Sequence, residues 1–380
     1  MRIFADENIP LLKAFFGDLG KVQTFNGRNV QAADLKDAEV LLVRSVTQVN
    51  RALLEGSAVR FVGTATIGTD HVDLDYLKEA GIGFSSSPGC NAQAVVDYVL
   101  SVLSVLVDAR DLPMNGLSVG IVGVGNVGHK LRLRLEEMGV SVLATDPFKT
   151  EEAVGPLTSL DEVLKCDVVT LHTPLTQDGD HPTWHMIGAE QLQQMQPDAC
   201  LINSCRGGVV DNDALLEHAV SQRDFDCVLD VWEHEPELDL NLMDCCLLAT
   251  PHIAGYSLDG KMRGTEMIYQ GLCDYFDIPI RRQLPQFLPE PGIKRVNFSD
   301  QEPHHQALRT AIRMAYEVRV DDGKMRTAMR KASDLRQAFD RLRSNYPMRR
   351  DIPTLKVGVP SKCLELQQIL KAAGFDVRTK

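Results

Sequence analysis

The stretch SVGIVGVGNVGHKLRLRLEEMGVSVLATD, residues 118 to 146, contains the features that decide the fold. An apolar run, 118 to 122, leads into Gly123, Gly125 and Gly128, and a helical pattern follows through Met138. The first glycine permits a tight turn, the second lets the backbone approach a pyrophosphate, and the third lets helix and strand pack closely. Free N–H groups at the start of the helix can bind phosphate. The stretch predicts the first βαβ unit of a dinucleotide-binding domain, with cofactor contacts at Gly123, Gly125, Asn126, Val127 and Gly128.

An acidic residue, Asp146, stands 18 residues beyond Gly128, at the end of the next apolar run. A carboxylate there can accept hydrogen bonds from both hydroxyls of the adenosine ribose, and it would repel a 2′-phosphate. The sequence therefore predicts NAD as the cofactor. Lys149 lies close enough to leave NADP open as the alternative.

Apolar runs alternate with helical patterns on both sides of this stretch, which is typical of parallel sheets covered by helices. We expect an α/β protein with two doubly wound parallel-sheet domains, one flavodoxin-like for the substrate (a lid) and one Rossmann domain for NAD, plus a C-terminal α/β domain. A long apolar helix from about Asn91 to Ala109 connects the first two. The expected bounds are 1–90 with about 257–285 for the first domain, 91–256 for the second, and 286–380 for the third, which a proline-rich linker (281 to 292) precedes.

Composition narrows the class of partner. The chain has 380 residues, 40 basic and 52 acidic, and its net charge of -12 argues against nucleic acid or an anionic membrane as a partner. Residues 301 to 350 carry a net charge of +6, for which a solvated helical face or a subunit contact is favoured over a site for a polyanion. The first residues lack the pattern of a secretory signal, so we expect a cytoplasmic protein. Nine scattered cysteines without a CxxC pair indicate neither a disulfide framework nor a metal site.

Three motifs after the glycine pattern carry side chains suited to acid–base chemistry. Arg206 lies in NSCRGGVVD (203 to 211), Glu235 in LDVWEHEP (229 to 236) and His252 in ATPHIAGYS (249 to 257). Each follows an apolar run, which places it at the carboxyl end of a strand, where open α/β sheets bind ligands.

Removal of hydride from a secondary alcohol needs a base for the hydroxyl proton and a cation that orients a carboxylate. His252 and Arg206 meet these needs. Glu235 precedes His252 by 17 residues and can favour its charged form, although Glu233 is an alternative partner. Cys205 next to Arg206 has no adjacent base that would make it a nucleophile. The motifs predict an oxidoreductase for a 2-hydroxy acid.

These motifs closely resemble those of the D-isomer-specific 2-hydroxyacid dehydrogenase family, N-x-x-R-G-x-x-V-D, D-V-x-x-x-E-P and T-P-H-x-A-G. The resemblance covers about residues 36 to 280. It implies that Arg206 orients the substrate, that His252 is the general acid/base, and that Glu235 is the partner of His252. It also implies cofactor contacts at Thr173, Cys205, Gly207, Asp230 and Gly255.

Within the family the chain most resembles the branch that oxidises 4-phospho-D-erythronate to 2-oxo-3-hydroxy-4-phosphobutanoate in pyridoxal 5′-phosphate (vitamin B6) synthesis. Ser45 in VRSVTQVN (43 to 50), Thr66 in GTATIGTDHVD (63 to 73) and Tyr256 add hydroxyls that suit a substrate with more hydroxyl and phosphate groups. The resemblance implies that these three contact the substrate, although Ser45 and Thr66 could instead form local turn bonds. Arg44 is a candidate for the substrate phosphate.

The same resemblance implies a homodimer that pairs through the C-terminal domain, with an amino-acid-sensing regulatory domain as the competing interpretation of residues 286 to 380. Two alternatives for the whole chain stay open. One is a dehydrogenase of another D-2-hydroxy acid, such as 3-phosphoglycerate. The other is a nicotinamide-sensing binding protein of the kind that serves as a transcriptional co-repressor.

Overall fold

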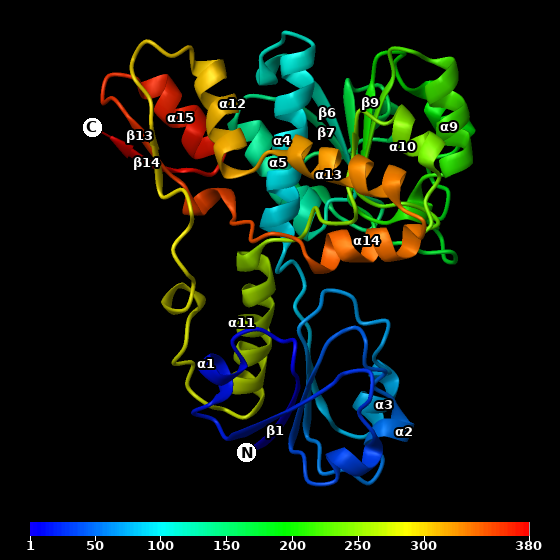
Figure 1. Cartoon of the computed structure of the whole chain (residues 1–380), viewed down its shortest axis with the longest axis vertical. Helices are drawn as coiled ribbons and strands as arrows, with labels where there is room; N and C mark the ends of the chain where they lie inside the picture. The colour runs from blue at the N-terminus through cyan, green and yellow to red at the C-terminus, as the bar shows by residue number, and fades with distance from the viewer. Residues whose placement is uncertain (380) are drawn as a thin grey trace. The chain divides into compact units, whose positions relative to one another are not determined.

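The computed structural model describes residues 1 to 379, and the chain divides into two compact units. The smaller unit comprises Met1–Asn91 and Ser257–Glu290. The larger unit comprises Ala92–Tyr256 and the described chain from Pro291 onward. Both are α/β structures with parallel sheets, as the sequence predicts (Figure 1).

The smaller unit contains a five-stranded parallel sheet in the order β2-β1-β3-β4-β5, which is the flavodoxin-like order. One face packs on α1 and α11, and the other packs on α2 and α3. The elements are β1 (Arg2–Asp6), α1 (Leu12–Phe16), β2 (Lys21–Phe25), η1 (Ala32–Leu35), β3 (Val40–Val43), α2 (Arg51–Leu54), β4 (Phe61–Thr64), α3 (Leu74–Glu79), β5 (Gly83–Ser85), α11 (Leu258–Tyr275) and η4 (Leu284–Gln286).

The larger unit contains a six-stranded parallel sheet in the order β11-β10-β9-β8-β6-β7. The chain moves outward from β6 to β7 and then crosses back to β8, so the strand order reverses beside β6. The elements are α4 (Ala92–Ala109), η2 (Met114–Gly116), β6 (Ser118–Val122), α5 (Asn126–Glu137), β7 (Ser141–Thr145), α6 (Glu151–Val154), α7 (Leu160–Val163), β8 (Val168–Leu171), α8 (Ala189–Gln194), β9 (Cys200–Asn203), η3 (Gly207–Val209), α9 (Asn212–Ser221), β10 (Asp226–Leu229), α10 (Leu240–Cys245) and β11 (Leu248–Ala249).

The helix α4 is apolar on almost every side because it is buried in this unit. It is the one described helix that is long and apolar enough to cross a membrane, and 89% of that window is buried inside the protein. An all-round apolar helix inside a packed domain is a core helix. Its side chains share one core with β6, α5 and the C-terminal helices.

The C-terminal region adds a second small sheet and four helices to the larger unit. The parallel sheet has the order β12-β13-β14, and Figure 1 shows α13 and α14 as neighbouring helices. Side chains of α12 and α15 enter the same core as α4, so the C-terminal region shares a hydrophobic core with the six-stranded sheet. The elements are β12 (Arg295–Asn297), α12 (His304–Ala315), α13 (Val318–Lys331), α14 (Leu335–Ser344), η5 (Ile352–Thr354), β13 (Lys356–Val359), α15 (Leu364–Ala372) and β14 (Asp376–Thr379).

The excess of positive charge in residues 301 to 350 faces acidic residues of the same unit. Arg309 and Arg313 both pair with Asp108 on α4, at 3.1 and 2.6 Å. Farther along, the basic side chains of α13 and α14 reach acids near α10, as in the pair of Arg330 with Asp244 at 2.7 Å. Much of the basic face is therefore used for packing this region on the larger unit.

Candidate active site

The glycine loop after β6 has the shape that a bound pyrophosphate needs. Gly123 has a φ of 90°, which favours glycine. A Cβ on Gly128 would lie 1.9 Å from the carbonyl oxygen of Gly123, whereas a Cβ on Gly125 would meet nothing within 4 Å. Helix α5 begins at Asn126, followed by Val127, so its free N–H groups face the loop.

A cavity of about 850 Å³ opens beside this loop, where the strand order reverses. It is lined by residues that follow β6, β7 and β8, among them Gly125, Asp146 and Thr173. The carboxylate of Asp146 accepts hydrogen bonds from the backbone N–H groups of Val124 (2.8 Å) and Phe148 (3.0 Å), which holds it at the end of β7. The open Gly125, the tight turn and this carboxylate fit an adenosine diphosphate moiety.

The segment from Pro174 to Thr183 also lines the cavity, and the sequence motifs gave no sign of it. Within it, the ring of His181 meets that of Phe148 edge-on, with centroids 5.5 Å apart. These two rings belong to segments that follow β8 and β7, so only the folded chain brings them together.

His252 and Glu235 form the predicted pair at the carboxyl ends of β11 and β10. The distance from Nδ1 of His252 to Oε1 of Glu235 is 2.6 Å, and both side chains are partly exposed. Burial by itself would raise the pKa of Glu235, but the hydrogen bond from His252 and its charge lower that pKa below the usual value. Glu235 is thus held as a carboxylate, which leaves Nε2 of His252 for a substrate.

The backbone at His252 is strained and is held by Asp230. His252 has a φ of 57°, unusual for a residue with a Cβ and often found at functional sites. Asp230 is buried, and its carboxylate accepts hydrogen bonds from the backbone N–H groups of Ile253 and Ala254, both at 2.8 Å, and from the hydroxyl of Thr250 at 2.7 Å. Asp230, expected to contact the cofactor, therefore also fixes the loop that carries His252.

Arg206 lies in the loop after β9, the neighbour of β10 in the sheet. Asn203 braces this loop: its side-chain oxygen accepts from the N–H of Cys205, and its amide donates to the carbonyl of Arg206. The guanidinium of Arg206 donates to the carbonyl of Cys205 at 2.7 Å and pairs with no carboxylate among residues 1 to 379. Burial raises the pKa of the Cys205 thiol, so that residue is a poor nucleophile.

The predicted substrate residues belong to different units. Ser45 and Thr66 follow β3 and β4, adjacent strands of the smaller unit. The hydroxyl of Thr66 lies 2.7 Å from that of Thr64 and donates to the carbonyl of Gly68, which is the local turn bonding left open as an alternative. Gly255 and Tyr256 end the His252 loop in the larger unit, and the Tyr256 ring meets Tyr346 of the C-terminal region.

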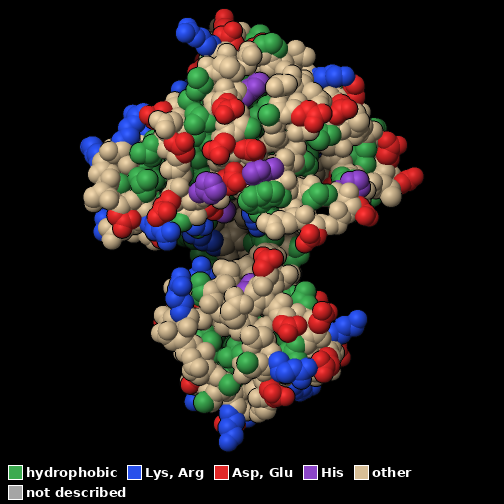
Figure 2. Space-filling view, turned by 90° about the vertical axis from the view of Figure 1, so that its right-hand side faces the viewer, with side chains coloured by type: hydrophobic (Ala, Val, Ile, Leu, Met, Phe, Trp, Pro, Cys, Tyr) green, Lys and Arg blue, Asp and Glu red, His purple; other side chains and the backbone are tan. Residues whose placement is uncertain are grey.

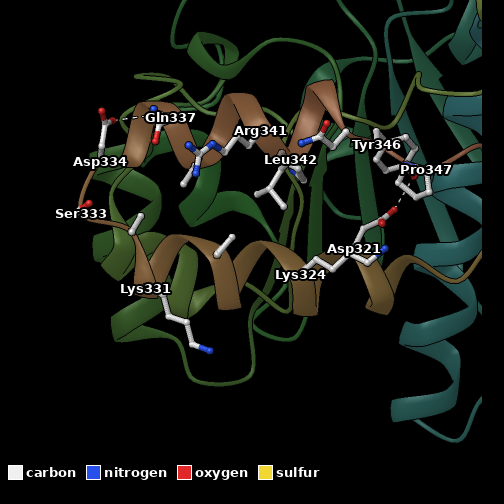
Figure 3. A pocket seen from close by; sticks show the side chains of 15 residues that line it. Asp321, Lys324, Lys331, Ser333, Asp334, Gln337, Arg341, Leu342, Tyr346 and Pro347 are labelled. Carbon is white, nitrogen blue, oxygen red and sulfur yellow. Dashed lines mark hydrogen bonds between the residues drawn. The ribbon is translucent and has the colours of Figure 1, made fainter.

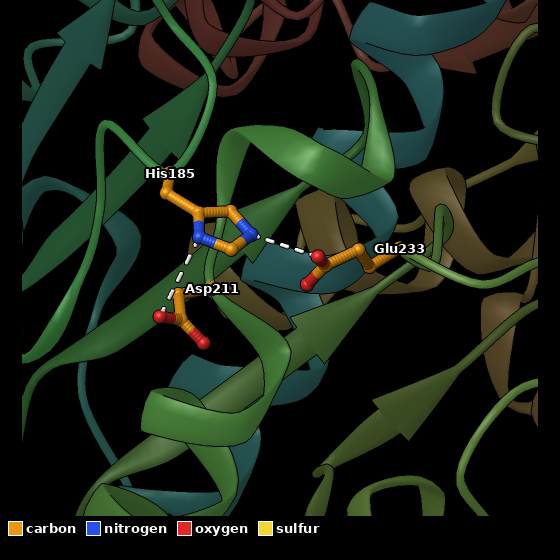
Figure 4. Close-up of side chains that lie close together, drawn as sticks. All are labelled: His185, Asp211 and Glu233. Carbon is orange, nitrogen blue, oxygen red and sulfur yellow. Dashed lines mark hydrogen bonds and ion pairs between the residues drawn. The ribbon is translucent and has the colours of Figure 1, made fainter.

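A second histidine–glutamate pair lies on the other side of the turn 232–235, which carries both Glu233 and Glu235. His185 and Glu233 are 2.7 Å apart between Nε2 and Oε1, and Asp211 lies near the other ring nitrogen (Figure 4). Glu233 thus pairs with His185, and Glu235 pairs with His252. Histidine and acidic side chains occur together on one face of the larger unit (Figure 2). No motif singled out His185, because it is separated from Glu233 by 48 residues.

A further cavity of about 610 Å³ lies between α13 and α14 (Figure 3). Side chains of both signs line it, including Lys324, Lys331 and Arg341 on one hand and Asp334 on the other. It reaches Pro251, the residue before His252. The C-terminal helices therefore border the loop that carries the candidate base.

The fold and these groups together define an NAD-dependent dehydrogenase of the doubly wound type, with a histidine–carboxylate pair at the strand ends. The family described as "D-isomer specific 2-hydroxyacid dehydrogenase, NAD binding domain" matches residues 108–254, and a domain of unknown function matches residues 287–374. The chain belongs to the erythronate-4-phosphate dehydrogenase family.

The relatives that show this membership match along the whole chain. An erythronate-4-phosphate dehydrogenase from Marinobacter nauticus is 51% identical over 100% of both chains, and one from Pseudomonas putida is 51% identical over 98% of this chain and 99% of its own. Among solved structures, a D-lactate dehydrogenase from Aquifex aeolicus in complex with NAD and lactic acid has a TM-score of 0.57 and 27% identity, and the match covers 73% of this chain and 96% of that one.

Proposed function

We propose that this chain oxidises 4-phospho-D-erythronate to 2-oxo-3-hydroxy-4-phosphobutanoate with NAD, in the synthesis of pyridoxal 5′-phosphate. The observation that carries the proposal is the 2.6 Å hydrogen bond between His252 and Glu235, on loops that adjoin that of Arg206, in a chain that matches named relatives over its full length. The substrate is a phosphorylated 2-hydroxy acid, as the name of those relatives indicates.

In this reaction His252 removes the proton of the substrate hydroxyl at C2. Its Nδ1 is taken by the carboxylate of Glu235, so the acceptor is Nε2. Glu235 stabilises the imidazolium that forms, because an ionised carboxylate at hydrogen-bond distance favours the charged ring. The Asp230 bonds keep the backbone of the loop in place as the ring gains its charge.

Arg206 supplies the cation. Its guanidinium pairs with no carboxylate of the described chain, so it can bind the substrate carboxylate and the reacting oxygen. The glycine loop at Gly123, Gly125 and Gly128 would hold NAD, which would supply the acceptor for the hydride of C2. We propose Ser45, Thr66 and Tyr256 as substrate contacts, and the residues of the glycine loop with Asp146, Thr173, Cys205, Gly207, Asp230 and Gly255 as cofactor contacts.

The test is formation of NADH by the purified chain with three acids under the same conditions. We expect turnover with 4-phospho-D-erythronate far above that with 3-phospho-D-glycerate or D-lactate. A preference for another acid would keep the roles of Arg206, Glu235 and His252 and replace the substrate. A nicotinamide-binding sensor would be favoured by two results together. The chain would oxidise none of the three acids, and an Arg206→Ala variant would still replace the wild type in the cell.

We also propose that the chain pairs with a second copy through its C-terminal region. Four large apolar side chains there are 46 to 67% exposed, namely Ile293, Met314, Val320 and Met348, and all four line one cavity. Contiguous exposed apolar surface is typical of subunit contacts. Light scattering should give twice the mass of one chain, and a Val320→Glu variant should shift the mass toward one chain.

A further inference from the structure

His185 contacts both loops that carry the candidate catalytic groups. Its backbone N–H donates to the carbonyl of Gly208, two residues after Arg206, at 2.8 Å. Its side-chain Nε2 lies 2.7 Å from Oε1 of Glu233, two residues before Glu235. The ring also stacks on Trp184, with centroids 4.6 Å apart and planes 15° from parallel, so its orientation is fixed.

Glu233 is more buried than Glu235 and Asp211, with a side chain that is 9% exposed against 26% and 31%. Its second oxygen accepts a hydrogen bond from the backbone N–H of Asn212, at the start of α9, at 3.1 Å. Its own N–H donates to the side-chain oxygen of Asn212 at 3.3 Å. The turn that ends in Glu235 is therefore fastened to α9 and to His185 by three hydrogen bonds.

The two loops also touch each other directly. A Cβ on Gly207 would lie 2.0 Å from the carbonyl oxygen of Trp232 and 2.5 Å from the nitrogen of Glu233. Movement of the turn that holds Glu233 would therefore displace the backbone next to Arg206 as well as Glu235. A shift of about 1 Å in a catalytic group can lower a rate by about 100-fold.

A hydrogen bond joins His185 to Glu233, whereas Asp211 only lies near the other ring nitrogen. In Figure 4 the imidazole lies between the two carboxylates, with Nε2 directed to Glu233 and Nδ1 to Asp211 at 3.6 Å. A metal ion would bind only one ring nitrogen and would need both carboxylates on that side. One oxygen of Asp211 also accepts from the backbone N–H of Ala214 as the N-cap of α9, which holds it in its present place.

We propose that His185 and Glu233 are positioning residues for the dehydrogenase reaction, because they lock the turn of Glu235 against the loop of Arg206. Neither side chain touches the reacting atoms in this proposal. It rests on the proposed function, since it assigns a task to the same site. Loss of the pair should lower the turnover number and should leave the affinity for NAD nearly unchanged, since the adenosine cavity does not include either residue.

The experiment compares His185→Ala, Glu233→Ala and the conservative His185→Gln in the full chain. We expect kcat to fall about tenfold in each alanine variant, with the Kd of NAD within about twofold of wild type. His185→Gln keeps an N–H donor near the position of Nε2, so it should recover most of the turnover. The matched control is His234→Ala, which removes an exposed histidine from the same turn and should keep wild-type turnover.

Double variants separate positioning from a general loss of stability. His185→Ala and Glu233→Ala should not multiply their losses, because both break the same contact. In a Glu235→Gln background His185→Ala should cost about threefold or less, since the carboxylate that the pair positions has lost its charge. If an alanine variant does not fold, Glu233→Gln and His185→Gln replace it and should both retain turnover within about threefold.

Three results of the kinetic and metal-binding experiments would overturn the proposal. The first is full turnover in a folded His185→Ala variant. The second is a double variant of His185→Ala and Glu235→Gln whose loss of kcat equals the product of the two single losses. The third is binding of Zn²⁺ or Mn²⁺ by wild type that His185→Ala abolishes. If wild type oxidises none of the acids tested, the proposed function fails, and proton NMR then tests the pair alone. The downfield N–H signal of the His252–Glu235 hydrogen bond, assigned with His252→Asn, should weaken in His185→Ala and persist in His234→Ala; persistence in both would overturn the proposal.

Discussion

The two histidine–glutamate pairs on either side of the 232–235 turn have almost the same geometry and different capabilities. The His252–Glu235 distance is 2.6 Å, and the His185–Glu233 distance is 2.7 Å. The histidines are equally exposed, at 31 and 32%. A distance between an imidazole and a carboxylate therefore does not identify a general base.

The two pairs differ in which ring nitrogen of the histidine remains available for a ligand. His252 uses Nδ1 for Glu235, so Nε2 is available for a proton of the substrate. His185 directs Nε2 to Glu233, and its Nδ1 faces Asp211. The first ring can exchange a proton with a ligand, whereas the second ring connects parts of the protein.

The largest effect is expected for His252→Asn. The amide nitrogen of asparagine can occupy the place of Nδ1 and donate to Glu235, and asparagine tolerates the positive φ at this position. Only the free nitrogen is lost. We expect kcat to fall by about 100-fold or more with NAD affinity near wild type, as measured by steady-state kinetics and NAD titration. Turnover close to wild type would remove His252 from its role.

The second prediction compares the loss of charge at Glu235 with the loss of charge at Glu233. Glu235→Gln keeps an acceptor for Nδ1 but removes the negative charge that favours the imidazolium, so kcat should fall about 30-fold. Glu233→Gln keeps the same kinds of hydrogen bond at a positioning residue and should cost about threefold or less. Steady-state measurement of kcat for both variants at one pH tests this expected difference. Equal losses would mean that the two pairs do not differ as proposed.

The lowered pKa of Glu235 adds a pH dependence to this pair. A carboxyl whose folded pKa is lowered stabilises the fold above its unfolded pKa, and this stabilisation disappears as the pH falls through the folded value. The pair should therefore stay intact at all pH values above the usual range of a glutamate. Its stabilising effect should be absent from Glu235→Gln.

Asp146→Ala tests a part of the site that neither pair contacts. This carboxylate lines the cavity beside the glycine loop and accepts from two backbone N–H groups. Its loss should weaken NAD about tenfold, while kcat at saturating NAD stays within about twofold of wild type. With Lys149 nearby, discrimination against NADP should also decrease. Calorimetric titration with both cofactors measures this, and an unchanged affinity for NAD would contradict the ribose assignment.

The sequence located the strands and the motifs because buried parallel strands appear as apolar runs. The apolar run 118 to 122 is β6 (Ser118–Val122), and the next apolar run, which leads to Asp146, is β7 (Ser141–Thr145). The groups that follow such strands lie at one edge of a parallel sheet, so Arg206, Glu235 and His252 could be identified as a set from their order alone. The named family and its NAD-binding domain confirm the function that these motifs indicated.

Features that depend on distant contacts could not be predicted. One example is the break between α12, which ends at Ala315, and α13, which begins at Val318. The hydroxyl of Ser101 on α4 donates to the carbonyl of Tyr316 and accepts from the N–H of Val318, which stabilises the break. The same applies to His185, whose partners come from later segments. No local pattern records such bonds.

The smallest expected effect concerns Asp97, a carboxylate whose surroundings shift its pKa in the direction opposite to that of Glu235. Asp97 lies on α4 and is fully buried, and burial, together with the charge of Asp351, raises its pKa to about 7, although Arg349 faces it too. It accepts hydrogen bonds from Ile352 N–H (2.8 Å) and from the amide of Gln93 (2.7 Å).

The raised pKa makes stability depend on pH between about 5 and about 7, where the stabilisation by Glu235 is complete and no longer changes with pH. Between the usual value of 3.8 and about 7, folded Asp97 holds a proton that the unfolded chain releases, so its stabilisation is complete below that window and is lost as the pH rises through it. Asp97→Asn does not titrate, and the side chain of Gln93 can turn over to face the new amide. Relative to wild type, the variant should gain on the order of 1 kcal/mol in free energy of unfolding between about pH 5 and about pH 8. Urea unfolding at both pH values measures the gain. If the free energy of unfolding changes equally in wild type and Asp97→Asn between the two pH values, Asp97 is already ionised in the folded protein. Burial would then not explain the difference between Asp97 and Glu235.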